Sequence, residues 1–314
     1  MRRLLTFLFL TLLAAAAAPA QVSVLQADDR ISVEIGGEHF TDLVLKGEDV
    51  RKPYFYPIRS ASGKVVTRHY PMKVIEGESH DHPHHRGLWF SHGDVNGFDF
   101  WTADPSRAGD HYGSIELDEV VEVTGGEREG SLKAVFDWKD GSGMTLLKET
   151  RTVRFSGADG LRVMDFHLEL TGVEDAHFGD TKEGTFAIRV ADSMNEQHSG
   201  TLVNAAGARG EERVWGKASP WMDYYGEVDG ETLGVAFLDH PSNPKHPTFW
   251  HVRGYGLFAA NVFGEHDFSA DDSRDGGLTL KKGERWEFRY RVLIHSGSPE
   301  EAGIAARYRE FSGE

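Results

Sequence analysis

Cysteine is absent from all 314 residues of the chain. Its absence excludes disulfide bonds, and it excludes a lipoprotein anchor, which needs a lipidated cysteine at the end of its leader. A domain of about 300 residues does not need disulfides, because it buries roughly three quarters of the surface of its unfolded chain. We therefore expect a fold that an apolar core holds together.

Basic residues are few relative to acidic ones. Lysine and arginine number 34 against 50 aspartates and glutamates, which gives a formal net charge of −16. This balance argues against nucleic acids and anionic membranes as partners, since phosphate groups call for a basic face. The Walker, Rossmann, G-x-S-x-G and H-E-x-x-H patterns are missing as well, so nucleotide-dependent chemistry and the familiar serine hydrolases are disfavoured.

Long apolar runs are missing except at the start of the chain. Two arginines precede a mainly apolar stretch of 15 residues from Leu4 to Ala18, and an A-x-A-like end follows at Ala20. This pattern predicts a signal peptide over residues 1–20, with cleavage before Gln21. A membrane anchor is the alternative, but a spanning helix needs about 20 apolar residues. We expect a secreted or periplasmic protein in which residues 21–314 form one domain.

Alternation of apolar and polar residues dominates the rest of the chain and predicts strands. One hairpin is expected from Ile31–Ile35 through Gly36-Gly37 to Phe40–Leu45. Further strands are expected at Ile115–Val123, Leu132–Trp138, Thr145–Phe155, Arg162–Leu170, Phe186–Val190, Gly234–Leu238, Leu257–Val262 and Trp286–Ile294. Many short strands between glycine turns indicate an all-β fold, a large antiparallel β-sandwich.

A single helix is expected, close to the end of the chain. Ser298 is a capping residue, Pro299 suits the first helical position and Glu301 the third, ahead of Ala302–Phe311. We therefore expect a short C-terminal helix beside the sandwich.

Histidine is concentrated in one segment. Five of the 16 histidines fall within 13 residues: His80, His82, His84, His85 and His92. Imidazole titrates near neutrality and is the commonest metal ligand. If the segment is extended, His80, His82 and His84 share one face, which is a common way to offer two ligands to one metal ion. The alternative is a polar loop in which these rings bond to the backbone and to one another.

Residues with chemical potential follow the histidines directly. Arg86 offers a planar fork for a carboxylate or for vicinal hydroxyls, unless it forms a structural ion pair with an aspartate. Trp89 and Trp101 are either core residues or stacking platforms for a pyranose ring. Asp94 and Asn96 would then bond its hydroxyls.

Two later segments carry further candidates. Lys182 and Glu183 precede an apolar strand, where a loop would present them at the rim of a sheet, and Glu183 could act as a general base if burial tunes its pKa. A solvated charged turn is the alternative. The proline-stiffened segment from residue 240 contains His246, Trp250 and His251, and long loops of this kind are often functional.

Several of these segments resemble a known family. The blocks Lys52–Pro57, Thr67–Pro71 and His82–Trp101 are similar to secreted bacterial proteins of unknown function that are often labelled methane oxygenase PmoA-like. The resemblance covers nearly the whole chain after the leader. That family tends to accompany genes for carbohydrate degradation and sugar oxidoreductases, so the resemblance implies a role in carbohydrate metabolism.

The plan of the chain is more faintly similar to the galactose-mutarotase-like supersandwich. In those proteins a histidine-containing segment, a glutamate and further histidines converge on a sugar. The resemblance implies these roles for His85-Arg86-Gly87 and for Glu183.

The leading hypothesis is a secreted carbohydrate-active enzyme that acts on a sugar or modified glycoside by histidine and glutamate acid–base chemistry. The candidate catalytic residues are His82, His85, Arg86, Glu183 and His251. The candidate substrate-binding residues are His84, Trp89, Asp94, Asn96, Trp101, Lys182, Arg189, His246 and Trp250. We expect the principal members to converge in one concave site, since separate loops at one rim of a sheet meet in space.

The residues leave the reaction open among hydrolysis, epimerisation and elimination. A metal-assisted version would place two or three of the clustered histidines on a divalent ion, which would be the only cofactor. The expected partner is a carbohydrate, either a small sugar or an oligosaccharide. The alternatives are a glycan-binding module without catalysis and, as the family label implies, a copper oxygenase with a closed histidine site.

Overall fold

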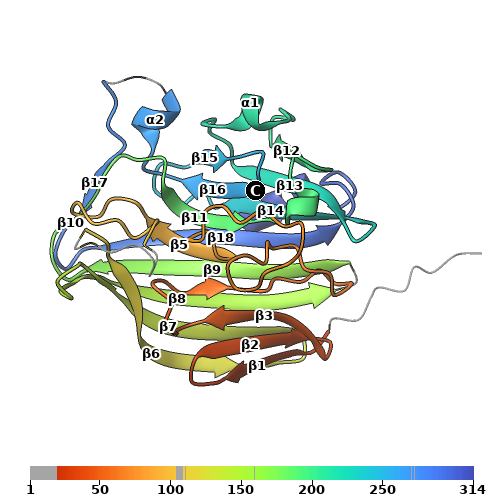
Figure 1. Ribbon diagram of the computed structural model, residues 1–314, viewed down its shortest axis with the longest axis horizontal. Helices are drawn as coiled ribbons and strands as arrows, with labels where there is room; N and C mark the ends of the chain where they lie inside the picture. Colours follow the sequence, from red (N-terminus) through yellow and green to blue (C-terminus); the bar gives the residue numbers. More distant parts are fainter. Residues whose placement is uncertain (1–19, 104–108, 110, 159, 270, 272) are drawn as a thin grey trace, which may run out of the picture.

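The computed structural model describes residues 20–103, 109, 111–158, 160–269, 271 and 273–314. The leader expected over residues 1–20 therefore lies, apart from Ala20, outside the described residues. The described chain folds into two large antiparallel sheets that pack face to face (Figure 1). No helix of the described residues is long and apolar enough to cross a membrane.

The first sheet has eight strands. In spatial order these are β1 (Val22–Gln26), β2 (Arg30–Ile35), β3 (Glu38–Val44), β4 (Tyr54–Phe55), β5 (Leu88–His92), β11 (Gly184–Arg189), β16 (Leu257–Asn261) and β15 (Phe249–Val252). All of its strand pairs are antiparallel. Strands β1 to β5, from the N-terminal part of the chain, thus meet the later strands β11, β16 and β15 in the middle of the sheet, where β5 pairs with β11.

The second sheet also has eight strands. In spatial order these are β12 (Thr201–Asn204), β13 (Trp221–Val228), β14 (Glu231–Asp239), β18 (Arg285–Ser296), β9 (Leu161–Gly172), β8 (Thr145–Ala158), β7 (Glu129–Lys139) and β6 (Ser114–Thr124). A small third sheet joins β10 (Ala176–Phe178) to β17 (Leu278–Leu280). The short helical elements are η1 (Asp192–Met194), α1 (Glu211–Val214) and α2 (Glu265–Ser269).

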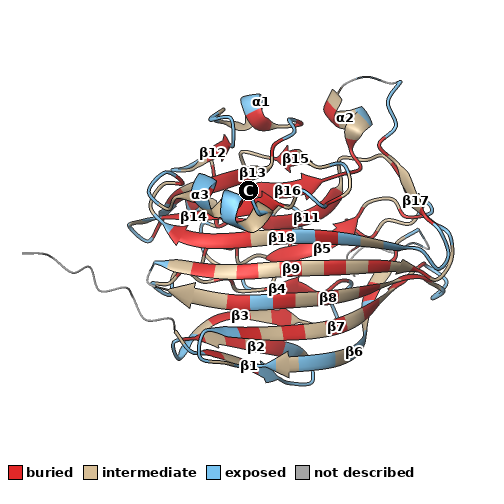
Figure 2. Cartoon of the chain, turned by 180° about the vertical axis from the view of Figure 1, so that it is seen from behind, coloured by how far each residue is buried: buried red, intermediate tan, exposed pale blue. Residues whose placement is uncertain are grey.

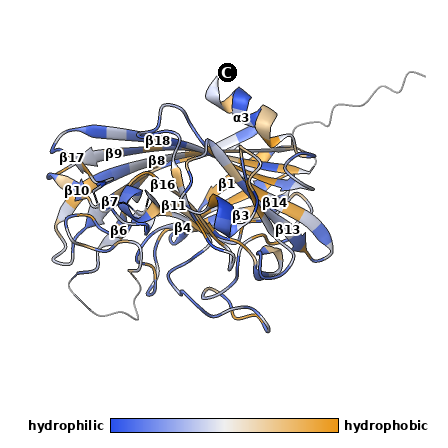
Figure 3. Cartoon of the chain, turned by 90° about the horizontal axis from the view of Figure 1, so that it is seen from above, coloured by the Kyte–Doolittle hydropathy of each residue, from blue (hydrophilic) through white to orange (hydrophobic). Residues whose placement is uncertain are grey.

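The main core lies between the two large sheets. Along β7 and β9 every second residue is buried, which gives the banded pattern of Figure 2 and matches the two-residue period of a strand. Apolar residues gather between the layers, whereas the loops are mostly hydrophilic (Figure 3). Rings interlock across the layers, as where Phe186 of β11 stacks on Tyr290 of β18 at 4.5 Å. The predicted antiparallel sandwich and all of its predicted strands are confirmed.

Three central strands of the first sheet are buried on both faces. Every residue of β5, β11 and β16 is buried, because the inner face meets the second sheet and the outer face lies under long loops. A second apolar cluster on that outer face includes Trp89, Trp101, Ala187 and Ala259. The loops that cover these strands carry the histidine run, so this outer face is where the candidate site lies.

The opposite side of the sandwich is covered by the C-terminal helix α3 (Ile304–Ser312), as Figure 3 shows. The predicted helix exists, but it begins at Ile304 rather than near Pro299. Ser298 and Glu301 do exchange capping hydrogen bonds, but the segment that they begin is a turn that ends at Gly303. Gly303 has a left-handed φ of 66°, and the helix begins at the next residue. Ile304 and Tyr308 of α3 pack on the outer face of the second sheet.

Candidate functional site

An open cleft of about 610 Å³ lies on the outer face of the first sheet. Three segments far apart in the sequence form its walls: the histidine run before β5, the turn before β11, and β15 with the loop after it. The lining residues are His82, His84, His85, Thr102, Lys182, Glu183, Gln197, Glu211, His251, Arg253 and Tyr255. The cleft therefore brings together six of the site residues predicted from the sequence, namely His82, His84, His85, Lys182, Glu183 and His251.

Strand register explains how the two main walls come to face each other. Trp89 of β5 pairs with Ala187 of β11, which is level with Ala259 of β16 and then with His251 of β15. Side chains in one such row share a face of the sheet. The backbones of β5 and β15 lie three strand spacings apart, roughly 14 Å at about 4.8 Å each. His251 therefore stands on one side of the cleft, and Trp89 supports the other.

The histidine run is a turn and not a strand. His82 has a left-handed φ of 43°, and the His85 amide donates to the His82 carbonyl oxygen at 3.0 Å. The expectation that His80, His82 and His84 share the face of an extended segment is therefore wrong. At the end of the turn Gly87 has a φ of 50°, and a Cβ atom there would lie 2.0 Å from the Phe55 carbonyl oxygen. Only glycine allows the run to pack this closely against β4.

Three rings, those of His82, His85 and Trp89, form a stacked column at this wall, and Tyr255 lies against its His82 end with its ring only 6.5 Å from that of His85. Tyr255 stacks on His82 with a centroid separation of 5.1 Å, His82 on His85 at 4.7 Å, and His85 on Trp89 at 5.3 Å. The interplanar angles of these three pairs do not exceed 21°. Trp89 is fully buried, whereas His82 is exposed. The column thus fixes the imidazole of His85 between a rigid base and an exposed histidine.

Two buried arginines support the column through one carboxylate. Arg68 and Arg189 have fully buried side chains, and both donate to Oδ1 of Asp81, Arg189 at 2.8 Å. Burial and the neighbouring charge of Arg189 lower the pKa of Arg68 to about 10. Two guanidinium groups that share one carboxylate leave positive charge under the histidines.

Asp81 also orients His82. The other carboxylate oxygen, Oδ2, lies 2.6 Å from Nδ1 of His82, so this ring nitrogen carries the proton. Burial alone would raise the pKa of Asp81, but the hydrogen bond from His82 and the charges of Arg189 and Arg68 hold it well below its ordinary value of 3.8. An ionised Asp81 thus fixes the orientation and the tautomer of the His82 ring, as in a histidine–aspartate pair that transfers protons.

His85 is held in the opposite tautomer. Nη1 of Arg189 donates to Nδ1 of His85 at 3.4 Å, and because arginine only donates, the proton of the neutral ring must sit on Nε2. Burial, together with the charges of His84 and Arg189, holds the pKa of His85 well below its ordinary value of 6.5. His85 therefore presents a neutral N–H group at the cleft.

His251 lies across the cleft as a neutral acceptor. Its Nδ1–H donates to the Lys182 carbonyl oxygen at 2.6 Å, which leaves a lone pair on Nε2. Burial lowers its pKa to about 4, although the hydrogen bond to Lys182 opposes this shift. His251 is thus unprotonated at neutral pH and is suited to accept a proton.

Glu183 stands beside His251 at the start of β11. Burial raises its pKa above the ordinary value of 4.5, and the charge of Lys182 opposes this shift. The Lys182 ammonium nitrogen lies 3.7 Å from Oε1 of Glu183, and about a third of each side chain is exposed. A carboxyl group with a raised pKa next to an open cleft is suited to donate a proton.

The far wall presents a rigid ion pair. Arg253 donates to Glu211 at 2.9 Å, and its guanidinium lies 5.3 Å from the ring centroid of Trp215. Glu211 also accepts from the Gly254 amide at 2.6 Å. With Gln197 and Thr102 these groups offer donors and acceptors around the cleft without closing it.

The comparisons with known proteins give a family. A model of a family of unknown function, DUF6807, matches residues 30–309. The chain belongs to this DUF6807 family. By sequence, no curated protein matches the chain.

Several solved structures are similar to this DUF6807 protein in outline. A galactose mutarotase-like protein from Clostridium acetobutylicum is 9% identical, with 89% of this chain and 99% of that one covered and a TM-score of 0.43. A galactose 1-epimerase from Lactobacillus acidophilus is 8% identical, with 90% and 100% covered and a TM-score of 0.39. An α-galactosidase from Lactobacillus brevis is 9% identical, with 90% of this chain but 40% of that enzyme covered and a TM-score of 0.41.

Three tryptophans of the DUF6807 protein do not reach the cleft. Trp89, Trp101 and Trp250 are all fully buried. Trp89 and Trp101 pack against each other beneath His85, and Trp250 lies between the two sheets, where its Nε1–H donates to the Ser219 carbonyl oxygen. Of the two roles considered for Trp89 and Trp101, core residue or stacking platform, the structure supports the core role, and Trp250, a substrate-binding candidate, does not line the cleft either. The apolar surface of these three rings is buried in the protein interior, where it stabilises the fold.

Other nominated polar residues have structural partners outside the cleft. Arg86 pairs with Asp49 at 2.7 Å. Asp94 and Asn96 form the turn that ends at Gly97: Asp94 accepts from the Gly97 amide, and Asn96 bonds to the backbone of Asp175 and His177. His246 bonds to Asp239 and Tyr308 beside α3, on the far side of the sandwich. Arg189, as described above, lies beneath the column.

The most important partners of the site were not nominated from the sequence. Arg68 and Asp81 orient two of the histidines, and Tyr255 lies against the His82 end of the column. Arg68 lies in a segment that carries the family resemblance, and Asp81 lies within the histidine run, so both had a weak signal. Glu211 and Gln197 lie in segments with no distinguishing pattern and could not have been found.

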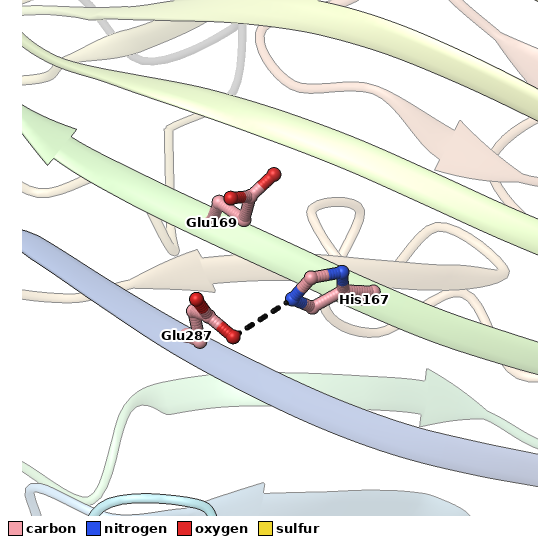
Figure 4. Close-up of side chains that lie close together, drawn as sticks. All are labelled: His167, Glu169 and Glu287. Atoms are coloured by element: carbon pink, nitrogen blue, oxygen red, sulfur yellow. Dashed lines mark hydrogen bonds and ion pairs between the residues drawn. The ribbon is translucent and has the colours of Figure 1, made fainter.

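A metal-binding geometry occurs elsewhere in the DUF6807 protein. Among the described residues, the one group of three histidine or acidic side chains with ligand atoms within 4.8 Å of one another is His167, Glu169 and Glu287. Figure 4 shows this group on β9 and β18, on the outer face of the second sheet. Arg285 already bonds Glu169 at 2.7 Å, and Arg289 lies 3.3 Å from Glu287. The histidine run forms no such group.

Proposed function

We propose that this protein is a carbohydrate-active enzyme that moves protons on a bound sugar or modified glycoside. One observation carries the proposal: a single open cleft contains an oriented histidine–aspartate pair, an unprotonated histidine and a carboxyl group with a raised pKa. Titratable groups with such divergent environments are typical of acid–base catalysis.

The lining of the cleft favours a sugar as the ligand. A volume of about 610 Å³ lies within the range of roughly 300–1,000 Å³ that small-molecule sites occupy. Thr102, Gln197, Lys182 and Arg253 offer hydrogen-bonding groups from several directions, which suits a ligand with many hydroxyls. The exposed His82 side chain adds a further polar group to this lining.

We assign separate duties to these groups. His251 accepts a proton through Nε2, and Glu183 donates one. His82, with Asp81 behind it, exchanges protons with solvent or with a second position of the sugar. Lys182 and Arg253 position hydroxyl groups by hydrogen bonds. Epimerisation, elimination and hydrolysis all include proton transfers that these groups can carry out.

A panel of sugars tests the proposal. Neutral monosaccharides and disaccharides, their keto derivatives and uronic acids would be screened for binding by calorimetry and for turnover by proton NMR. We expect turnover of at least one member and a loss of about 10²–10⁴-fold in kcat for His251→Asn. Asparagine keeps a donor to the Lys182 carbonyl oxygen but lacks Nε2, so binding should change only a few-fold.

The matched control is His167→Gln, which alters a partly exposed histidine on the opposite sheet and should behave as the wild type. Wild-type turnover by His251→Asn would contradict the assignment of the base. A sugar that binds in the cleft but is never turned over would instead identify a glycan-binding module.

A further inference from the structure

His85 is built unlike the other histidines of the cleft. Its ring is only 1% exposed and lies between His82 on one side and Trp89 on the other, with the Trp101 ring edge-on at 5.9 Å. The groups that face it are His82, His84, Arg68 and Arg189. In the part of the chain that the structure describes, no carboxylate forms a hydrogen bond or an ion pair with this ring.

The contacts of His85 make it a permanent hydrogen-bond donor. Arg189 occupies Nδ1, and Nε2 is the nitrogen left to face the cleft that His85 lines. Positive charge from Arg189 at Nδ1 draws electrons from the ring and makes the Nε2–H a stronger donor. The surroundings of His85 disfavour addition of a second proton, so the ring stays neutral. The neutral ring donates a hydrogen bond through Nε2–H and keeps that proton.

Such a donor suits one kind of substrate oxygen. A glycosidic or ring oxygen that leaves must receive a whole proton, which a neutral imidazole does not supply. A carbonyl oxygen that becomes an enolate oxygen needs only a strong, fixed hydrogen bond as its negative charge develops. Arg68 and Arg189 beneath the ring add a favourable field for that charge.

We propose that the substrate is a sugar with a ketone or aldehyde carbonyl, whose oxygen accepts a hydrogen bond from Nε2 of His85. This inference rests on the proposed function, because it assigns the base to His251. Nε2 of His251 takes the proton from the carbon next to the carbonyl, and the electrons of that C–H bond form a C=C bond. The carbonyl π electrons move to the oxygen, which becomes an enolate oxygen bonded to His85.

The step is complete without an oxidant or a metal ion. Return of a proton from His251, after exchange with solvent, to the face it left regenerates the starting carbonyl compound, whereas inversion takes a proton from another group of the cleft. Loss of a group from the next carbon, with a proton from Glu183, gives an unsaturated keto-sugar instead, and the C–H proton then passes from His251 to solvent. In D₂O the C–H signal of the substrate disappears in both routes, so loss of that signal is the common signature.

The first test needs no substrate. Nitrogen-15 NMR of the histidine rings in the free protein reports which nitrogen carries the proton. We expect His85 to be neutral and protonated on Nε2 between pH 5 and pH 8, with the signal assigned by its loss in His85→Phe. A ring protonated on Nδ1, or a charged ring at pH 7, would overturn the inference.

The second test uses matched probes in D₂O: methyl glucopyranoside and its three ring-keto derivatives. Proton NMR should show deuterium entering next to the carbonyl of at least one ketone and no exchange in the parent glycoside. His85→Phe keeps the stack but lacks the N–H, and we expect at least a 100-fold slower exchange. His85→Gln, which restores a donor at the position of Nε2, should recover part of the rate, and His167→Gln should match the wild type.

The two proposals fail in different ways. Turnover of a sugar without a carbonyl, with no exchange in any ketone, would leave the proposed function standing and overturn the carbonyl inference. Unchanged exchange in His85→Phe would also overturn it. Failure of every probe to bind or react would overturn the inference together with the proposed function.

Discussion

A base with a low pKa and an acid with a raised pKa make opposite demands on pH. His251 must be unprotonated, and burial places its pKa at about 4, so kcat/KM should fall as the pH drops through that value. Glu183 must be protonated, so kcat/KM should fall again as the pH rises through its raised pKa. We expect a bell-shaped profile whose acid limb falls near pH 4 and whose alkaline limb follows the raised pKa of Glu183.

The variant Glu183→Gln separates the two limbs of this profile. It should be slower, and its profile should lose the alkaline limb while it keeps the acid one. An acid limb that instead falls between about pH 6 and 7, near the ordinary pKa of histidine, would assign the base to His82 rather than to His251.

Single residues set the limit on what the sequence can predict about the site. His82, Glu183 and His251 are recognisable because imidazole and carboxyl groups near strand ends are characteristic of catalytic sites. Trp89 and Arg189 are not distinguishable from exposed residues by their neighbours in the sequence, because burial depends on strands that pair over long separations. The opposite tautomers of His85 and His251 depend on one contact each, with Arg189 and with a carbonyl oxygen.

At the scale of elements, the contribution of helix α3 to the free energy of unfolding is the simplest to measure. Ile304 is fully buried and packs with Leu238 and Leu293. Removal of this side chain down to Cβ should lower the free energy of unfolding by about 2–4 kcal/mol, because a cavity is added to the lost burial. Urea unfolding of Ile304→Ala measures this loss.

The matched control for this measurement is Glu310→Ala on the exposed face of the same helix, which should change the free energy of unfolding by less than about 0.5 kcal/mol. Since α3 lies on the opposite sheet, ligand binding in the cleft should be the same in both variants. Equal unfolding midpoints for the two variants would show that the helix is not docked as described.

Strands differ in how clearly the pattern of apolar and polar residues predicts them. In the second sheet, β7, β8 and β9 alternate because one face meets the core and the other meets solvent, and they were expected together with β6. β5 has the sequence Leu-Trp-Phe-Ser-His and no alternation, because both of its faces are buried. Periodicity therefore did not detect β5, which supports the candidate cleft, and it did not detect β4, β13 or β15 either.

At the scale of the whole molecule, the first described strand begins just after the position where the leader is expected to end. β1 starts at Val22, and the Gly36 amide donates to the Gln21 carbonyl oxygen at 2.8 Å. Cleavage before Gln21 would therefore leave every strand of the described residues in place. We propose that the exported protein starts near Gln21, and N-terminal sequencing of the form released from a bacterial host tests this. A secreted form that still begins with Met1 would contradict it.

The overall architecture was accessible from the sequence, whereas the partners of each strand were not. Alternation and glycine turns predict a sandwich, but they do not reveal that β5 pairs with β11 across nearly 100 residues. The cleft exists because of that pairing and of the row that continues to His251. Several residues of the cleft could be predicted from the sequence, whereas their arrangement in space depends on how the strands pair in the fold.

The place of β18 has a consequence for biosynthesis. Residues 285–296 form the last strand of the chain, yet they lie between β14 and β9 in the interior of the second sheet. While the ribosome is still making these residues, both neighbouring strands carry unpaired edges, which are prone to pair with other chains. Long-range pairing of this kind is slow. The second sheet is therefore completed only after residue 296 has been made, and until then the edges of β14 and β9 stay open to other chains.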